Sequence, residues 1–468
     1  MNKITIFFTT LFVAGLALPI SNLLNFAGEN EPIAVKVGSS EKFAQVSQIW
    51  QNKCVDCHSP NMTRMPIYAN FPIAKPLMAK HIEEATQRFV LVTEIYNGEI
   101  PLTPLMLARL EGVIRNDEMP PVSYLSMHWD GGLTQGEKQT ILEWIFEERA
   151  KLPAHLQTAE NLKGEPIQPL PLKIEVNPEK VALGQKLFHD PNLSGDNTVS
   201  CSSCHDLTKG GTDQSKVSTG IRGQQGGINS PTVYNASYNV AQFWDGRAKD
   251  LQEQAAGPIA NPIEMGANWD EVIEKLKAIP EYQQAFANLY AEKGLTKATV
   301  TDAIATFEES LITPNSRFDQ YLRGNEAALT ADEKEGYALF KENCASCHFG
   351  EALGGGSFEK MGAKNNYFKL RGGELTEADN GYFNFTKQEK DRYFFKVPVL
   401  RNVEHTAPYF HNGHAKTLAE AVKIMAKVEK DKNFTQAEID KVVAFLKTLT
   451  GEYKGKSVAQ LTTKDVKK

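Results

Sequence analysis

The sequence has no cysteine to spare. All six cysteines of the 468 residues belong to Cys-x-x-Cys-His motifs, so none remains for a structural disulfide. A zinc site is also disfavoured, because no two Cys-x-x-Cys pairs show knuckle spacing and each pair is followed by its own histidine. The motifs are Cys54-Val-Asp-Cys57-His58, Cys201-Ser-Ser-Cys204-His205 and Cys344-Ala-Ser-Cys347-His348.

A basic stripe is also lacking. The net charge is −6 and the pI is near 6.0, which argues against nucleic acid as a partner. The only short basic run, Lys464, Lys467 and Lys468, is expected to be a solvated tail. With 41% hydrophobic and 23% charged residues, the composition is that of a soluble globular protein of about two to four domains.

What the sequence does contain is the attachment signature of a c-type haem. In such a motif the two thiols add to the haem vinyl groups and the adjacent histidine binds the iron from one side. A redox dithiol would explain one such motif, but not three that use every cysteine. We therefore expect three covalently bound haems c.

The N-terminus has the character of an export signal, which attachment of haem c outside the cytoplasmic membrane requires. Lys3 is followed by an uncharged run to Gly28, long enough for a membrane span of about 20 residues. No Ala-x-Ala cleavage site closes the run, although Pro19, Ser21 and Asn22 weaken it as a span. We favour an uncleaved anchor over a cleaved signal peptide. With Lys3 inside, the rest of the chain would lie in the periplasm of a bacterium, at the inner membrane.

A helix over Glu41–Trp50 is predicted to lead into the first haem motif, and one over Thr134–Lys151 to close that domain. Met119 is the best candidate for the second axial ligand of this haem, because Pro120 prevents helix continuation and leaves a loop that can present the thioether. The competing candidates are Met62, Met65, Met78, Met106, Met127, His81 and His128.

Helical patterns dominate the remainder, so the predicted fold is mostly α. Ala182–Phe188 precedes the second haem motif and Gly336–Phe340 the third, which indicates a duplicated unit. Further helices are predicted over Trp269–Leu276, Thr299–Ile312, Leu418–Val428 and Gln436–Leu449.

From about Asn177 to Tyr453 the chain resembles the bacterial dihaem cytochrome c peroxidases. The likeness rests on the stretches Leu187–Pro191, Asn229–Asn235, Gln242–Ala248, Gly257–Pro258, Pro262–Met265, Val397–Val403 and Thr406–His411. The additional N-terminal haem domain and the predicted anchor make the whole look like the trihaem, membrane-attached branch described as quinol peroxidases.

The resemblance implies an architecture of three c-type cytochrome domains, the last two forming a dihaem cytochrome c peroxidase-like pair. The expected parts are an N-terminal signal anchor at residues 1–28, a monohaem cytochrome c domain at 41–152, a proline-rich linker at 153–178, a peroxidatic haem domain at 179–328 and a high-potential electron-transfer haem domain at 329–468.

The resemblance also implies roles for individual residues. The peroxidatic site would comprise His205 as proximal ligand, Glu264 as distal acid–base group and Gln254 beside it. The electron path would comprise His348 and Met425 as ligands of the third haem, a pair that suits a high-potential donor, and Trp244 between the two haems. A calcium ion would be held by Asn229, Thr406 and Pro408, whose oxygens are ligands of the type calcium prefers.

One residue is absent where many relatives have it. In those proteins a histidine in the loop after the peroxidatic haem blocks the iron of the oxidised enzyme, and the matching position here is Ile221. Isoleucine cannot bind iron. We therefore expect the resting protein to be open without reductive activation.

The expected function is reduction of hydrogen peroxide in the periplasm. Its electrons would come from membrane quinol, ubiquinol or menaquinol, and pass through the N-terminal and third haems and Trp244. No sequence motif marks a quinol pocket. A soluble cytochrome c is an alternative donor, and a multihaem electron carrier without catalysis is an alternative function. A relative that oxidises protein side chains is disfavoured, because such relatives have a tyrosine where Met425 stands.

Overall fold

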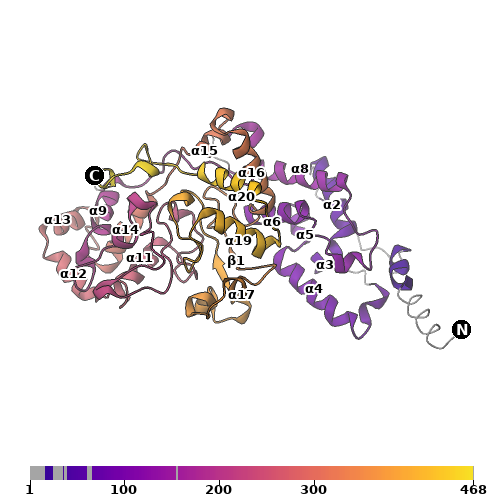
Figure 1. Cartoon of the computed structure of the whole chain (residues 1–468), viewed down its shortest axis with the longest axis horizontal. Coiled ribbons are helices and arrows are strands. Elements are labelled where there is room, and N and C mark those ends of the chain that lie inside the picture. Colours follow the sequence, from indigo (N-terminus) through magenta and orange to yellow (C-terminus); the bar gives the residue numbers. More distant parts are fainter. Residues whose placement is uncertain (1–15, 25–34, 36–39, 61–65, 154–156, 467–468) are drawn as a thin grey trace. The chain divides into compact units, whose positions relative to one another are not determined.

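The computed structural model describes residues 16–24, 35, 40–60, 66–153 and 157–466. The chain divides into two compact units, residues 1–153 and residues 154–468, and both are built of helices (Figure 1). The only paired strands among the described residues form two short antiparallel ribbons. These are β1 (Phe358–Lys360) with β2 (Phe394–Lys396), and β3 (Glu452–Tyr453) with β4 (Lys456–Ser457). The predicted mostly α fold is confirmed.

The first unit packs its helices around an aromatic core. Trp50 and Trp144 meet edge to face with ring centroids 5.1 Å apart, and both side chains are buried. Ser40 caps the first helix, and Thr134 with Glu137 forms a capping box on the last. These two helices confirm the predictions made for Glu41–Trp50 and Thr134–Lys151. The helices are α2 (Glu41–Lys53), α3 (Val55–His58), α4 (Ala74–Arg88), α5 (Thr93–Tyr96), α6 (Pro104–Arg115), α7 (Val122–Leu125) and α8 (Gln135–Lys151).

The N-terminal segment is described only over residues 16–24, where the chain is helical to residue 23. The Asn22 side chain donates a hydrogen bond of 2.8 Å to the Met127 carbonyl oxygen, which fixes this segment to the first unit. None of the described helices is both long enough and apolar enough to cross a membrane. Most of the predicted anchor lies outside the described residues.

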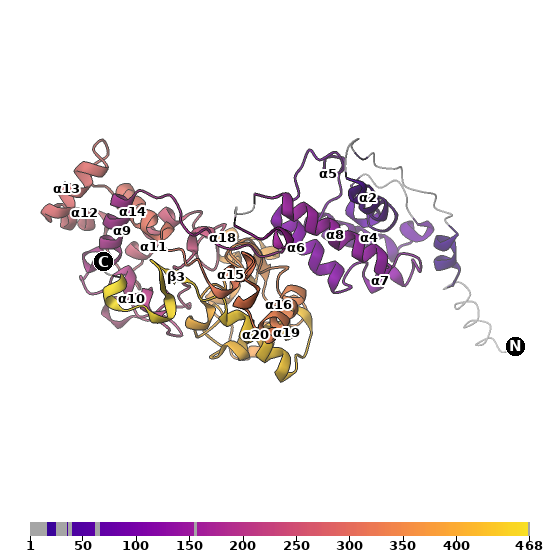
Figure 2. The same ribbon diagram turned by 90° about the horizontal axis from the view of Figure 1, so that it is seen from above.

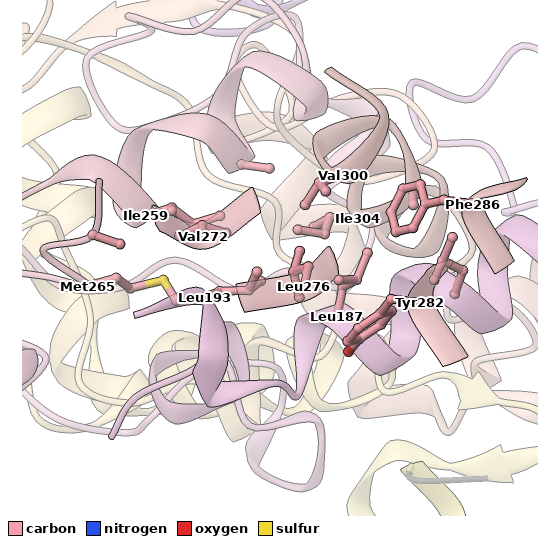
Figure 3. Close-up of a cluster of buried hydrophobic side chains, with 14 of the residues drawn as sticks. Leu187, Leu193, Ile259, Met265, Val272, Leu276, Tyr282, Phe286, Val300 and Ile304 are labelled. Carbon is pink, nitrogen blue, oxygen red and sulfur yellow. The ribbon is translucent and has the colours of Figure 1, made fainter. Parts of the chain in front are cut away.

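The second unit contains the two remaining haem motifs. Its first part encloses a hydrophobic core into which Leu187, Leu276 and Ile304 project from three different helices (Figure 3). Each such side chain contributes about 1.5–3 kcal/mol when fully buried. The helices of this part are α9 (Pro178–Phe188), α10 (Cys201–Cys204), α11 (Leu251–Ala260), α12 (Trp269–Lys277), α13 (Pro280–Leu289) and α14 (Lys297–Glu309).

The second part of this unit has a core of its own, formed largely between α16 and α20 (Figure 2). Phe340 and Phe445 face each other across it with ring centroids 5.0 Å apart. Its helices are α15 (Arg317–Leu322), α16 (Ala331–Asn343), α17 (Tyr367–Arg371), α18 (Phe383–Thr386), α19 (Leu418–Lys430), α20 (Gln436–Lys447) and α21 (Thr463–Val466).

The sequence pattern shared by the stretches before the second and third haem motifs corresponds to the same kind of helix crossing in both. Gly184 of α9 lies against α14, and Gly336 of α16 lies against α20. A Cβ atom at either glycine would overlap a backbone carbonyl oxygen of the facing helix, that of Ala303 or Lys441. The crossing therefore requires glycine at both positions, which is why the two sequences share it.

The predicted proline-rich linker, residues 153–178, falls almost entirely within the second unit, and much of it is packed. Ile167 and Leu170 are completely buried in the second unit, and the Pro166 carbonyl accepts a hydrogen bond of 2.9 Å from the Gly350 amide. This stretch therefore belongs structurally to the second unit over that length and is not a free spacer there.

Candidate active site

Two of the three haem motifs begin where a helix ends, and the other forms a helical turn of its own. Cys54 terminates α2 and Cys344 terminates α16, while Cys201–Cys204 forms the single turn α10. All six thiols are free of disulfides, and burial raises the pKa of Cys54 and Cys344 to about 12. Redox-active cysteines are exposed and have lowered pKa values. Half-buried thiols with raised pKa values, one turn apart and followed by histidine, instead fit covalent attachment of haem.

The motif histidines are in the form that binds iron. Burial lowers the pKa of all three, that of His348 to about 4, so the imidazoles are neutral. His58 donates from Nδ1 to the Phe89 carbonyl oxygen over 2.7 Å, and His348 donates to the Leu353 carbonyl oxygen over 3.1 Å. This leaves Nε2 for the iron. Nδ1 of His205 is buried without a hydrogen bond among the described residues.

Glu264 lies on a tight turn that follows α11. The Met265 amide donates to the Pro258 carbonyl oxygen over 3.2 Å, and the Glu264 amide donates to the Asn261 carbonyl oxygen over 3.0 Å. The loop after the second haem motif also binds this turn, because the Ile221 amide donates to the Glu264 carbonyl oxygen over 2.9 Å. The backbone that carries the predicted acid–base group is therefore fixed from two sides.

The Glu264 carboxyl group lies close to the second haem motif. Burial raises the pKa of the Cys204 thiol, and the negative charge of Glu264 adds to that rise. Burial also raises the pKa of Glu264 itself, while the positive charge of Arg247 and a hydrogen bond from Asn261 partly offset the rise. The Asn261 Nδ2 group donates to Glu264 Oε1 over 2.7 Å. This is an oriented carboxyl group with a raised pKa, as proton transfer near neutral pH requires.

Trp244 is fixed between the two parts of the second unit. Its Nε1 group donates to the Asn229 carbonyl oxygen over 2.8 Å. Its ring meets Phe395 and His411 edge to face, with centroids 6.5 Å and 6.3 Å away. Trp244 and Met425 both border the hydrophobic cluster that contains Phe395. The predicted bridge and the predicted ligand of the third haem are therefore neighbours of one core.

Two residues close to Trp244 in sequence, Phe243 and Arg247, lie near α11 and Glu264. The ring of Phe243 lies against Gly257 of α11, and the Arg247 guanidinium stacks on that ring, 3.5 Å from its centroid. Arg247 is also the cation that lowers the pKa of Glu264. The segment 243–247 thus contacts the Glu264 side through Phe243 and Arg247, and the Met425 side through Trp244.

The remaining predicted site residues stay predictions. Gln254 is half-buried on α11, the helix that leads into the Glu264 turn. Met119 lies in the loop between α6 and α7 and is half-buried. The competing Met106 packs against the aromatic core of the first unit.

Two of the three predicted calcium ligands lie beside the loop at residues 213–216. Asn229 Nδ2 donates to the Ser215 carbonyl oxygen over 2.8 Å, and Pro408 lines a pocket together with Gln214. Thr406 Oγ1 donates to the Val403 carbonyl oxygen over 3.1 Å. The ion itself stays a prediction.

An oriented carboxyl group beside a Cys-x-x-Cys-His motif, in a mostly helical fold, is the arrangement expected of a haem peroxidase. The sequence profile of the di-haem cytochrome c peroxidase family matches residues 178–327, that of a haem-binding domain matches residues 20–147, and that of cytochrome c matches residues 333–450.

Individual relatives agree with the profiles. The chain is 46% identical to cytochrome c peroxidase Ccp of Escherichia coli (strain K12), over 86% of each chain. It is 50% identical to cytochrome c551 peroxidase of Nitrosomonas europaea, over 62% of this chain and 85% of the relative. A solved MauG-like protein associated with microbial copper homeostasis matches with a TM-score of 0.52 and 30% identity, covering 61% of this chain and 93% of that protein.

The chain therefore belongs to the di-haem cytochrome c peroxidase family. It is a peroxidase with covalently bound haem c, and its substrate is hydrogen peroxide.

Two neighbours of Glu264, the predicted acid–base group, were not singled out from the sequence. Asn261 and Arg247 both lie within or beside stretches that carry the family resemblance, Pro262–Met265 and Gln242–Ala248. The available signal for Asn261 was its spacing, because an amide three residues before a glutamate in a turn can reach the carboxyl group. Nothing in the spacing links Arg247 to Glu264.

Ile221 gives a spectroscopic prediction. Its side chain is 2% exposed and packs against Gly266, so the loop holds the Glu264 turn and offers no ligand. We expect oxidised protein, as purified, to show a high-spin haem signal in optical and electron paramagnetic resonance spectra. Ile221→His should convert this signal to six-coordinate low-spin, while the control Ile221→Val should keep it. Wild-type protein that is entirely low-spin would contradict the prediction.

Proposed function

We propose that this peroxidase takes its electrons from membrane quinol and works on the periplasmic side of a bacterial inner membrane. The observation that carries the proposal is the first unit, which folds around its own aromatic core and contains a haem motif outside the peroxidase pair. An uncharged run of sequence, residues 4–28, stands at the beginning of this unit. A protein held at the membrane has direct access to a lipid-soluble donor, and an additional haem site provides the entry point for its electrons.

Peroxide reduction needs a proton moved between the two peroxide oxygens as well as two electrons. When haem is bound at Cys201, Cys204 and His205, its iron supplies the redox chemistry. Glu264 acts first as a base, taking a proton from one peroxide oxygen. It then acts as an acid, returning that proton to the other oxygen, which leaves as water. Asn261 keeps the carboxyl group in one orientation during both transfers, and Gln254 hydrogen-bonds the peroxide.

Electrons would enter at the haem site of His58 and Met119 and then reach the haem site of His348 and Met425. Thioether ligation raises haem potential, which suits that second site as the immediate donor. Trp244 would carry electrons on toward the peroxidatic site. We further propose a calcium ion at Asn229, Thr406 and Pro408 that stabilises the contact between the two parts of the second unit.

The donor is tested by measuring peroxide consumption of the detergent-solubilised holoprotein. A short-chain quinol and reduced cytochrome c are compared as donors, because relatives of this chain are named cytochrome c peroxidases. Fast turnover with quinol, lost when Cys54 and Cys57 are both replaced by serine, is the expected result. Turnover only with cytochrome c would contradict the quinol route but would retain the role of Glu264.

A further inference from the structure

One buried cation of the second unit has no anion beside it. Lys396, on strand β2, is 5% exposed. Of the lysine and arginine side chains in the described part of the chain, two others are also buried, and each pairs with a carboxylate. Arg149 binds Glu111 and Arg401 binds Asp319, both over 2.8 Å. Lys396 is the exception, because its ammonium group has neither a salt bridge nor a hydrogen bond to any residue that the structure describes.

The ammonium group of Lys396 is charged at neutral pH even without a partner. Burial alone lowers the pKa of Lys396, to about 8. A nearby carboxylate would raise this pKa again, but none of the described residues does so. A charge removed from water without a partner is costly, so buried charges in proteins are normally paired. The burial of Lys396 therefore points to an anion that the described residues do not supply.

The strand that carries Lys396 lies against the segment around Trp244. The Lys396 amide donates to the Trp244 carbonyl oxygen over 2.9 Å. Across the ribbon Lys396 pairs with Phe358, and paired residues have their side chains on the same face of a sheet. The Phe358 ring lies so close to Gly246 that a Cβ atom there would overlap it. The Lys396 side chain is therefore on the ribbon face that packs against segment 243–247, which contacts the two predicted haem sites of this unit.

The other face of the ribbon borders the third haem motif. Glu359 pairs with Phe395, so both side chains lie on this face. Burial raises the pKa of the Cys347 thiol, and the negative charge of Glu359 adds to the rise. Phe395 belongs to the hydrophobic cluster that Met425 borders. The ribbon therefore lies between the third haem motif and segment 243–247.

We propose that Lys396 binds a propionate carboxylate of a haem attached in the second unit. A haem c carries two propionates, and these are the anions that the covalent cofactor brings into the interior of the chain. The contact would be a charge-assisted hydrogen bond, whether the propionate belongs to the haem of the second motif or to that of the third. Its positive charge favours reduction of that haem, because it stabilises the added electron. The inference does not depend on which donor supplies the electrons.

The test measures the reduction potential of each haem in the holoprotein by spectroelectrochemical titration. Lys396→Met removes the charge and keeps most of the volume. It should lower the equilibrium constant for reduction of one haem about tenfold, which is a midpoint lower by about 59 mV. Lys396→Gln, a second neutral variant that keeps a polar end group, should give the same shift, and Lys396→Arg should keep the wild-type potential. The matched control is Lys360→Met on β1, because an exposed charge is screened by solvent and salt.

The outcomes also identify which haem supplies the propionate. A lower potential confined to the high-spin haem assigns it to the haem of the second motif, and one confined to a low-spin haem assigns it to the haem of the third. Potentials that neither neutral variant changes would contradict the inference. A shift of equal size in Lys396→Arg would contradict it as well, because the positive charge would then not be the cause.

Discussion

Replacing Glu264 with glutamine is expected to lower the kcat for hydrogen peroxide by about 10²–10⁴-fold, because glutamine cannot move the proton between the peroxide oxygens. The amide is nearly the same size and can keep a hydrogen bond to Asn261, so the fold and the haem spectra should not change. Steady-state peroxide consumption with any competent donor measures the effect. Glu274→Gln, at an exposed position paired with Lys277, is the matched control.

The pH dependence distinguishes proton transfer from a structural role. Burial raises the pKa of Glu264, and the base form is the ionised carboxylate. Turnover of wild-type protein should therefore fall as the pH decreases through this raised pKa, and Glu264→Gln should lose that acid limb. Glutamine that keeps both the rate and the acid limb would show that another group moves the proton.

Replacing Arg401 with methionine is expected to destabilise the second unit by about 3–5 kcal/mol, the usual cost of removing one partner of a buried ion pair. Arg401 and Asp319 are both completely buried, and their Nη2 and Oδ1 atoms are 2.8 Å apart. The guanidinium also donates to the carbonyl oxygens of Glu351 and Gln168, over 2.7 Å and 3.2 Å. It therefore joins three stretches of chain that are far apart in sequence.

Urea unfolding followed by far-ultraviolet circular dichroism measures this loss as a lower midpoint at similar slope. Lys277→Met is the control, because its partner Glu274 is exposed and such surface pairs contribute about 0–1 kcal/mol. An Arg401→Met protein as stable as the control would mean that the buried pair does not hold the second unit together.

The sequence was sufficient for the haem motifs, for the long helices and for the duplication. Cys-x-x-Cys-His is a local signal that needs no knowledge of the fold. Helices such as α2, α8 and α19 have apolar residues at helical spacing, which is also a local signal. The duplication was visible because a similar glycine-containing helical stretch, with Gly184 or Gly336, precedes each of two haem motifs. Family resemblance was needed for Glu264, since an isolated glutamate gives no sign of its burial.

Long-range contacts could not be predicted. Tyr124 and Asp56 are separated by 68 positions, and no periodicity connects them. His128 was expected to be either a haem ligand or an ordinary histidine, whereas the structure places it in a stacked pair with Tyr124. The proline-rich stretch was expected to be a linker from its composition, but the burial of Ile167 depends on a core formed by helices more than a hundred residues later.

We infer that the chain has a single open haem site, at His205 beneath Glu264, and that the other haem sites only transfer electrons. Titration of the oxidised holoprotein with cyanide, followed by optical spectroscopy, tests it most directly, since cyanide binds where iron lacks a sixth ligand. We expect one cyanide bound per chain of wild-type protein, and none bound to Ile221→His at the same concentration. Wild-type protein that binds no cyanide, or more than one per chain, would contradict it.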